Sequence, residues 1–439
     1  MTKINLPENV KFIIDTLNKA GFEGYAVGGC VRDSLLGREP DDWDITTDAK
    51  PEQMKQLFRR TVDTGIQHGT VTVLVGDDTY EVTTYRIDGE YEDSRHPKQV
   101  EFTTNLVEDL KRRDFTINAM AYNDSTGIID EFGGIEDLHA GIIRCVGNPE
   151  ERFGEDALRI MRAVRFSAQL GYEIEEKTSE AIVKLSYTLK KISAERIHVE
   201  LSKLIVSPNP GFIRKAYETG ILEVILPELS SVMEVEQNNP HHCYTVGEHI
   251  VRTVENIEAD RVLRYAMLFH DIGKGPCKTT SEDGIDHFHG HALASGRMTR
   301  EIGKRLKFDN DTLGKVLTLV EYHDWKIDPT QIAVRRAMNK LGADMFPLLL
   351  KVKKADIDAQ SMYKREEKQT NLDELWEIYG QIVERKDCVT IKDLAINGKD
   401  LMEMGIEQGP EIGVTLNRLL DYVLDDPTLN TRGHLLELL

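Results

Sequence analysis

Two aspartates stand one residue apart in the run DDWDI, near the end of the stretch 25–45. The apolar residues beside them predict a short strand, along which side chains alternate between two faces. Asp42 and Asp44 should therefore share one face, while Trp43 and Ile45 point into a core. Two carboxylates about 6 to 7 Å apart on a rigid strand suit Mg²⁺, a hard cation that prefers oxygen ligands. The pair is a candidate catalytic metal site.

A Gly-Gly pair precedes these aspartates. A short apolar strand ends at Gly28 and Gly29, and a helix that carries Arg32 in its first turns follows. Glycines remove the side chains that would keep a triphosphate away from backbone N–H groups at a helix start. A plain turn is the alternative for the glycines alone, but with the aspartates they predict a phosphate cradle beside a metal. Glu81, in the expected strand 80–87, is a candidate third catalytic carboxylate or simply a solvated strand residue.

Histidines gather in the middle of the chain, where eight of the 13 fall between His241 and His323. Imidazoles and carboxylates are the ligands that divalent transition metals prefer when cysteine is absent. The order H…HD…H…H…D predicts a second metal centre with the candidate ligands His249, His270, Asp271, His291, His323 and Asp356. The competing residues are His287 and His289 for His291, and Asp324 and Asp358 for Asp356. A helical spacer without metal is the alternative.

Two further motifs carry polar groups suited to a nucleotide. In RRDFTINAM (112–120), Arg112 and Arg113 can meet phosphates or the ribose, while Asp114 and Asn118 can make polar contacts to the sugar. This motif is a candidate nucleotide-binding segment.

The stretch EDALRIMRAVRF (155–166) predicts one helix. Asp156 and Arg159 are three residues apart, so they should lie on one face of it. Asp156 can accept from an exocyclic amine and Arg159 can donate to ring acceptors, so the pair can read the edge of C or A. An intrahelical salt bridge between them is the alternative. Arg162, on the adjoining face, is a candidate contact to the triphosphate or RNA. Arg196, in ISAERIHVEL, is expected to be scaffolding.

Strand and helix signals alternate over the first 150 residues and then give way to helical periodicity. We expect an α+β protein: a small mixed α/β head followed by all-helical domains. The expected boundaries are 1–149 for the head, 150–235 for a neck, 236–365 for the histidine-rich domain and 366–439 for a tail. Turn formers predict breaks at 207–210 and 236–242, and a polar run predicts another at 364–372.

The chain of 439 residues has a net charge of −20, and its first 150 residues hold 28 acidic against 16 basic residues. This acidity excludes capture of nucleic acid by a bulk positive field, although Arg159, Arg162 and Arg165 could form a local basic face. The sequence contains no apolar run long enough to cross a membrane and no secretory signal, so a cytoplasmic location is expected. Five scattered cysteines predict no disulfide framework.

The Gly-Gly pair followed by Asp-x-Asp resembles the motif of the nucleotidyltransferase superfamily that includes DNA polymerase β. The motifs at 112–120, 155–166 and 192–201 narrow the resemblance to class II tRNA nucleotidyltransferases and bacterial poly(A) polymerases. The resemblance implies a two-Mg²⁺ mechanism with Asp42 and Asp44 as ligands. It also implies that Asp156 and Arg159 replace a nucleic-acid template.

Two details favour CCA addition over poly(A) synthesis. TGIQHGTVTV (64–73) resembles the CCA-adding form, and the basic element typical of the polymerases is missing. Residues 86–102 resemble the loop that CCA-adding enzymes need for the final A. The implied partners are therefore tRNA, CTP and ATP, with a poly(A) polymerase, an A-adding enzyme or a non-catalytic RNA-binding protein as alternatives. No signal indicates an oligomeric state.

The histidine-rich segment resembles the HD superfamily of metal-dependent phosphohydrolases. In that family two ions are bridged by one aspartate, here Asp271, with His291 and His323 completing the second ion. The resemblance implies hydrolysis of 2′,3′-cyclic or 2′ phosphates with a transition metal of the Ni, Mn, Co or Fe class. Residues 391–430 resemble the tRNA-binding tail of CCA-adding enzymes, with a helix start after Gly409.

Overall fold

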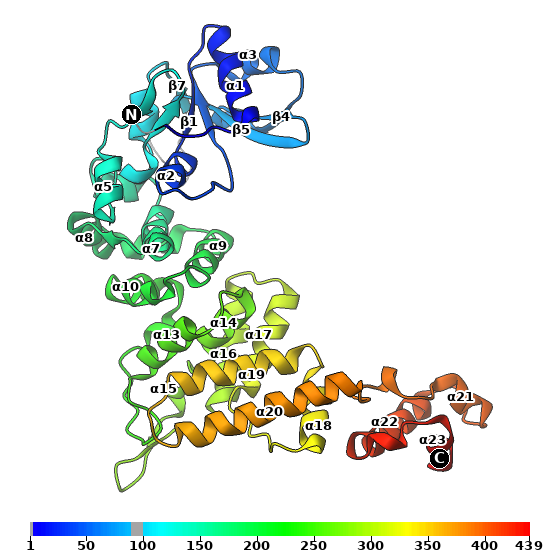
Figure 1. Cartoon of the computed structure of the whole chain (residues 1–439). Helices are drawn as coiled ribbons and strands as arrows, with labels where there is room; N and C mark the ends of the chain where they lie inside the picture. Colours follow the sequence, from blue (N-terminus) through cyan, green and yellow to red (C-terminus); the bar gives the residue numbers. More distant parts are fainter. Residues whose placement is uncertain (1–2, 89–99) are drawn as a thin grey trace. The chain divides into compact units, whose positions relative to one another are not determined.

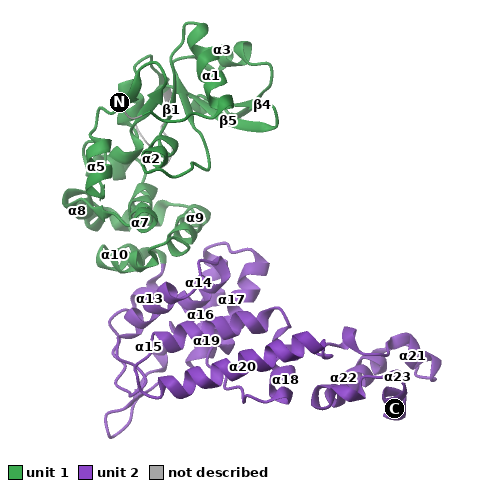
Figure 2. Cartoon of the chain, viewed as in Figure 1, with its two compact units in different colours: residues 1–225 green, residues 226–439 purple. Residues whose placement is uncertain are grey.

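The computed structural model describes residues 3–88 and 100–439 and divides into two compact units, residues 1–225 and 226–439 (Figure 2). The architecture is α+β, with one large mixed sheet in the first unit and a nearly all-helical second unit (Figure 1). The unit boundary falls within the predicted neck, short of its expected end at 235. The four-domain division stays a prediction.

The head is built on a seven-stranded sheet with the order β3-β4-β5-β2-β1-β8-β9. Its strands are β1 Gly24–Val27, β2 Ile45–Thr47, β3 Thr61–Gly65, β4 Thr70–Val75, β5 Asp78–Thr84, β8 Ala121–Asn123 and β9 Gly127–Ile129. Strand β1 lies antiparallel between β2 and β8, and β2 runs parallel to β5. The expected strand 80–87 breaks at Tyr85, after which β6 Arg86–Asp88 pairs with β7 Val100–Phe102. Most of the loop predicted at 86–102 lies outside the described residues.

Helices α1 Glu8–Lys19 and α3 Pro51–Leu57 pack on this sheet. The buried residues of α1 recur at helical spacing, which gives the helix one apolar face: Val10, Ile13, Ile14 and Leu17. They meet Ile45 of β2 and the β-branched residues of β4 and β5. This core holds β1 and β2 rigid, and these strands flank the predicted aspartate pair.

The rest of the first unit is mainly helical: α2 Gly29–Leu35, α4 Leu106–Lys111, α5 Gly134–Ala140, α6 Pro149–Glu155, α7 Leu158–Leu170, α8 Glu176–Leu185, α9 Ala194–Ile205, α10 Ile213–Glu218 and α11 Ile221–Ile225. The single helix predicted over 155–166 was wrong, because Asp156 adopts an extended conformation between α6 and α7. Its carboxylate accepts the Leu158 N–H at 3.0 Å and so begins a new helix. A two-residue pairing of β10 Ile142–Ile143 with β11 Glu173–Ile174 also interrupts the expected all-helical neck.

The second unit comprises α12 Pro227–Ser230, α13 Val246–Asn256, α14 Arg261–Phe269, α15 Lys274–Cys277, α16 His291–Arg305, α17 Asn310–Tyr322, α18 Gln331–Leu341, α19 Met345–Asp358, α20 Arg365–Arg385, α21 Gly398–Glu403, α22 Pro410–Asp425 and α23 Arg432–Glu437. A short hairpin, β12 Thr279–Thr280 with β13 Asp286–His287, interrupts the helices. The break at 236–242 is confirmed, since this segment is non-helical. The break predicted near 364–372 lies at the start of that range, at Lys364 with φ +54°, and the residues that follow begin α20.

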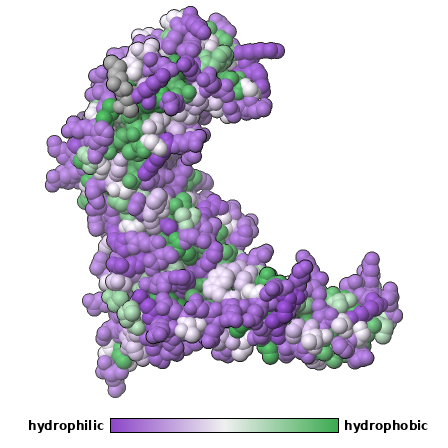
Figure 3. Space-filling view, in the orientation of Figure 1, coloured by the Kyte–Doolittle hydropathy of each residue, from purple (hydrophilic) through white to green (hydrophobic). Residues whose placement is uncertain are grey.

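Residues after α20 build a separate small core around Leu401, Leu419 and Val423. All five cysteines are free, as expected. Among the described residues, no helix has the length and apolar character needed to span a bilayer. The face seen in Figure 3 is mostly hydrophilic, with apolar side chains in small groups.

A buried ion pair between α7 and α9 provides a test of the first unit's packing. Arg165 Nε lies 2.6 Å from Glu200 Oε2, and both side chains are 7% exposed. Replacing Arg165 by Met leaves the carboxylate buried without its partner, so we expect a loss of about 3 to 5 kcal/mol of stability. Urea unfolding followed by circular dichroism measures it.

The matched control is Lys184→Met, which breaks an exposed pair with Glu150 (63% and 52% exposed). It should cost less than about 1 kcal/mol. Equal shifts for the two variants would contradict the role given to the buried pair.

Candidate active site and candidate metal centre

The aspartate pair lies at the entrance to β2 rather than within it. The strand begins at Ile45, which corrects the expected strand over Asp42 and Asp44, although the Asp44 carbonyl still accepts the Val27 N–H of β1 at 3.0 Å. The predicted alternation is confirmed: Asp42 and Asp44 are exposed, Trp43 packs against the core and Ile45 is buried in it. Both carboxylates therefore face solvent from a backbone that the core holds.

Register places Glu81 on the same face. Ile45 pairs with Val82 in the parallel ladder, so one residue earlier Asp44 stands beside Glu81, and both are exposed. The pKa of Asp44 is raised, first because the surrounding protein reduces its hydration and also because Asp42 is near, while Arg113 opposes the rise. Among the described residues, however, the carboxylate oxygens of Asp42, Asp44 and Glu81 do not all lie within 4.8 Å of one another. The three side chains therefore do not form a ready-made metal cluster.

The guanidinium of Arg113 lies against the Gly-Gly turn. Gly28 has φ +84°, and a Cβ built on it would lie 2.9 Å from Arg113 Nη1, so both the backbone and the neighbouring arginine require glycine. The Gly28 N–H donates to the Met120 carbonyl at 3.1 Å. This amide is therefore engaged, and a cradle made by the N–H groups at the start of α2 stays a prediction. The positive charge available at the turn is that of Arg113.

Asp109, which sequence reasoning missed, organises the two predicted arginines. It is fully buried; Arg112 Nη2 lies 2.7 Å from its Oδ1, and Arg113 Nη2 lies 3.6 Å from its Oδ2. Thr46 of β2 donates to the same carboxylate at 3.1 Å. Burial would raise the pKa of Asp109, but the two guanidinium charges outweigh it and lower the pKa. The i, i+3 and i, i+4 spacing to the arginines was the available signal.

A chain of hydrogen bonds joins four other predicted residues. Arg32 donates to the Asn118 side chain at 2.6 Å, and Asn118 donates to Asp114 at 3.1 Å. Arg162 of α7 donates to the other Asp114 oxygen at 2.7 Å. Burial opposes ionisation of Asp114, but Arg162 and Asn118 lower its pKa to about 2. Asp114 and Asn118 were expected to contact a sugar; in this structure they join the head to α7.

The predicted base-reading residues take different partners. Arg159 is 9% exposed and its Nη1 lies 2.6 Å from Glu155, while Asp156 accepts from Arg196 at 2.9 Å. The intrahelical pair between Asp156 and Arg159 does not form, because Asp156 lies between the two helices and Arg159 of α7 pairs with Glu155 at the end of α6. Arg196 acts as the expected scaffold. Arg165 is buried against Glu200, so it was wrongly assigned to an exposed basic face.

The predicted histidine ligands converge in the second unit. Each ring places Nδ1 against a backbone carbonyl: His249 on Ala359 at 3.3 Å, His270 on Met267 at 2.7 Å, His291 on Phe288 at 2.9 Å and His323 on Val320 at 2.8 Å. A carbonyl only accepts, so each Nδ1 carries the proton and each Nε2 keeps its lone pair. Such carbonyl bonds orient histidines that bind metals.

Asp271 lies between two groups of these nitrogens. His249 and His270 Nε2 lie 3.4 and 3.2 Å from its Oδ2, and His291 and His323 Nε2 lie 3.3 and 3.6 Å from its Oδ1. Asp356 Oδ1 is 3.0 Å from His249 Nε2. Among the described residues, Asp271 Oδ1 is a buried oxygen without a hydrogen-bond partner. This donor set fits two cations that share Asp271.

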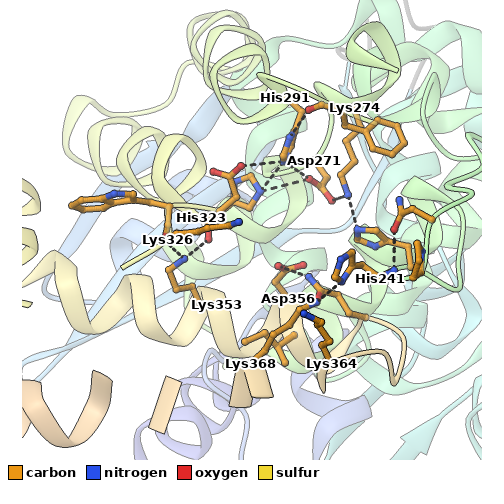
Figure 4. A pocket seen from close by; sticks show the side chains of 18 of the residues that line it. His241, Asp271, Lys274, His291, His323, Lys326, Lys353, Asp356, Lys364 and Lys368 are labelled. Carbon is orange, nitrogen blue, oxygen red and sulfur yellow. Dashed lines mark hydrogen bonds and ion pairs between the residues drawn. The ribbon is translucent and has the colours of Figure 1, made fainter. Parts of the chain in front are cut away.

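Four of these residues, Asp271, His291, His323 and Asp356, line a pocket of about 1070 Å³ (Figure 4). Of the competing residues, His287 and His289 line it but stack on each other, with ring centroids 5.6 Å apart. Asp324 reaches only 4.0 Å from His291, and Asp358 is bound by Lys354.

Lys274 was also missed as a part of this centre. The sequence offers it in GKGPCKTT (273–280), which lacks the P-loop spacing. In the structure its buried ammonium lies 2.7 Å from Asp271 Oδ2 and donates to Gln237 at 2.7 Å. Burial would raise the pKa of Asp271, but His270 and Lys274 lower it.

The arrangement around Asp109 predicts a loss of triphosphate binding in Asp109→Asn. The neutral amide can no longer hold Arg112 and Arg113 against β2, so the affinity for a nucleoside triphosphate should fall about tenfold or more. Isothermal titration calorimetry measures it. Asp137→Asn is the control, because Asp137 is another buried head carboxylate, bound to Arg144. Equal effects of the two variants would contradict a specific role for Asp109.

Comparisons with known proteins match most of the chain. A Poly A polymerase head domain matches residues 24–144, an RNA and SrmB-binding site of polymerase A matches 171–233, and a tRNA nucleotidyltransferase domain 2 matches 288–439. The chain resembles the crystal structure of the Bacillus stearothermophilus CCA-adding enzyme in complex with CTP, with a TM-score of 0.73 and 30% identity over 98% of this chain and 96% of that one.

Two relatives extend over nearly the whole length. The CCA-adding enzyme of Lactobacillus helveticus is 36% identical over 95% of this chain and 93% of its own. That of Streptococcus thermophilus is 34% identical over 95% and 92%. Similarity of this extent shows that the chain belongs to the CCA-adding enzyme family.

Proposed function

We propose that the chain adds C, C and A to the 3′ end of tRNA, with CTP and ATP as substrates and without a nucleic-acid template. The observation that carries this proposal is the pair Asp42 and Asp44, exposed on one face beside a rigid strand in a chain related along its whole length to CCA-adding enzymes. A related structure holds CTP. Arg113 supplies a positive charge at the Gly28 turn, as a triphosphate requires.

In this proposal the carboxylates of the head bind metal ions and its arginines bind phosphates. Asp42, Asp44 and Glu81 hold divalent ions, Mg²⁺ in this proposal, and these ions would activate the 3′-hydroxyl and neutralise the leaving pyrophosphate. Arg112 and Arg113 bind the phosphates. The tRNA 3′-oxygen forms a bond to the α-phosphorus and loses its proton, while the bond from that phosphorus to the oxygen of the β-phosphate breaks.

Base choice falls to Asp156 and Arg159 in this proposal. Their groups are those that can pair with the edges of C and A. In the present arrangement Arg196 and Glu155 hold them in position, so a base must share or replace these partners. Arg162, 34% exposed on the next turn, is placed for the triphosphate or RNA.

Terminal addition tests the proposal directly. Incubation with a tRNA that lacks its 3′ end should yield two C and then one A when CTP and ATP are supplied. Asp42→Ala and Asp44→Ala should slow addition about a hundredfold or more, because a lost metal ligand removes several kcal/mol of transition-state stabilisation. Gel resolution of the labelled tRNA measures it.

Asp41→Ala is the matched control, since Asp41 is an exposed aspartate directly before the pair and is not among the proposed metal ligands. It should keep the full rate. Incorporation of A alone would favour a poly(A) polymerase or A-adding enzyme, and full activity of Asp42→Ala would show that the site is misplaced.

We propose in addition that the pocket of the second unit is an HD-type phosphohydrolase. What supports this is the set of four carbonyl-oriented histidines around Asp271, together with the buried Asp271 oxygen that lacks a hydrogen-bond donor. His249, His270, Asp271 and Asp356 would hold one transition-metal ion of the Ni, Mn, Co or Fe class; Asp271, His291 and His323 would hold another.

The proposed substrate is a 2′,3′-cyclic or 2′ phosphate ester of a damaged RNA end. The two ions would activate water and stabilise the charge that develops on phosphate. The water oxygen forms a bond to phosphorus and gives up a proton, while one ester P–O bond breaks and its oxygen leaves as a hydroxyl. Lys274, beside Asp271, is placed to bind a phosphate oxygen.

Metal content separates this proposal from a structural spacer. After loading with Ni²⁺, Mn²⁺ or Co²⁺ and gel filtration, elemental analysis should find about two ions per chain. His291→Ala and His323→Ala should retain about one ion and lose cyclic-phosphate hydrolysis, because the second group keeps only Asp271 and one histidine. His289→Ala, in the same pocket, should retain both ions. If the protein binds no metal and hydrolyses no cyclic phosphate, the histidine-rich region is a structural spacer.

A further inference from the structure

Three lysines line the same pocket as His241 and are not among the proposed metal ligands: Lys326, Lys364 and Lys368 (Figure 4). Lys368 Nζ lies 3.1 Å from His241 Nδ1. Burial lowers the pKa of His241, and the positive charges of Lys368, Lys364 and Lys326 lower it further. None of them is a metal ligand in the proposed hydrolase, and we call this group the lysine subsite.

Hydrogen bonds tie this subsite to the metal cluster. Gln360 Nε2 donates to Asp356 Oδ2 at 2.8 Å, and Gln360 Oε1 accepts from Lys368 Nζ at 2.5 Å. One amide side chain thus separates a metal ligand from Lys368. A group bound at the lysine subsite would therefore be adjacent to a group bound at the metals, as neighbouring phosphates of one chain are.

The charges of the subsite are poorly compensated by the protein. Among the described residues, no carboxylate comes within the ion-pair distance of 4.0 Å of Lys326 or Lys368. Lys364 has only Glu367, at 3.7 Å, and both of these side chains are largely exposed. Carboxylates also line this pocket, but among the described residues none of them forms an ion pair with Lys326 or Lys368. An anionic ligand beside these lysines would relieve their mutual repulsion.

An aromatic side chain stands beside the subsite. Tyr363 is 47% exposed and directly precedes Lys364, and its ring meets the His241 ring edge-on with centroids 5.0 Å apart. Met362, next to it, is 78% exposed. A partly exposed aromatic next to a phosphate-binding cation is the combination with which proteins hold single-stranded nucleic acid.

We propose that the lysine subsite binds a second phosphate of the HD substrate, so that the pocket takes an RNA end of at least two nucleotides rather than a mononucleotide. The terminal phosphate ester lies at the metals, the preceding phosphate lies against Lys368, Lys326 and Lys364, and the preceding base stacks on Tyr363. This inference rests on the proposed phosphohydrolase function of the pocket.

Two substrates that differ by one nucleotide test it: uridine 2′,3′-cyclic phosphate, and UpU with a 2′,3′-cyclic end. Uridine is chosen because the proposed nucleotide addition uses C and A. On the metal-loaded full chain, the dinucleotide should have the lower KM. Lys368→Ala and Lys326→Ala should each raise the KM for the dinucleotide about tenfold, because each removes one charge-assisted contact to the second phosphate. The KM for the mononucleotide and the kcat for both substrates should stay unchanged.

Lys315→Ala is the control, because Lys315 is an exposed lysine of α17 that pairs with Asp311 outside the pocket. It should change neither KM. Equal KM values for the two substrates in the wild type, or equal changes for both in the lysine variants, would overturn the proposal.

Binding separates failure of the subsite from failure of the hydrolase. Calorimetry with UpU 3′-phosphate and uridine 3′-phosphate needs no turnover. A preference for the dinucleotide that Lys368→Ala abolishes supports the subsite even where hydrolysis is absent, in which case the hydrolase proposal alone fails. Equal binding of the two ligands overturns the subsite whatever the rate of hydrolysis.

Discussion

The ion pair between the buried Asp114 and the partly exposed Arg162 is the interaction on which the first unit's site depends. A carboxylate removed from water is costly unless it is paired and hydrogen-bonded, and Asp114 meets this condition only when Arg162 of α7 and Asn118 of the head are both in place. Arg32, which follows the Gly-Gly turn, is bound to the same Asn118. The head and the helix that follows Asp156 are thereby held in one arrangement.

Other buried carboxylates are also paired with cations, and the carboxylates that depart from this rule lie in the two candidate metal sites. Asp109 and Glu200 are compensated by arginines and act as structural centres. Asp271 is different, because one of its oxygens is buried without a donor while four imidazole nitrogens point towards it. Asp42 and Asp44 differ in another way, since they remain exposed. Among the described residues, carboxylate oxygens that remain exposed or lack a hydrogen-bond donor are those that can receive a cation.

The acidity of the chain is compatible with anionic substrates because charge acts locally in a screened medium. In the head, Arg112 and Arg113 pair with the buried Asp109, and the charge of Arg113 also acts on Asp44. In the second unit, lysines crowd one pocket. Each site thus places cations, either from the protein or from bound metal, where phosphates would lie.

Local pattern in the sequence was enough for the α+β class, the outward face of Asp42 and Asp44, and the set of histidines that meet at Asp271, because strand alternation and ligand type depend on residues near in sequence or on chemistry alone. The sequence did not reveal the kink at Asp156, the partners of Arg159, the engagement of the Gly28 amide, or the roles of Asp109 and Lys274. Those were decided by long-range packing: a buried charge takes whichever partner the fold brings within reach, and Arg162 reaches Asp114 from 48 residues away. Tertiary structure alone therefore determined which of the predicted polar residues are held within the protein and which remain available to a ligand.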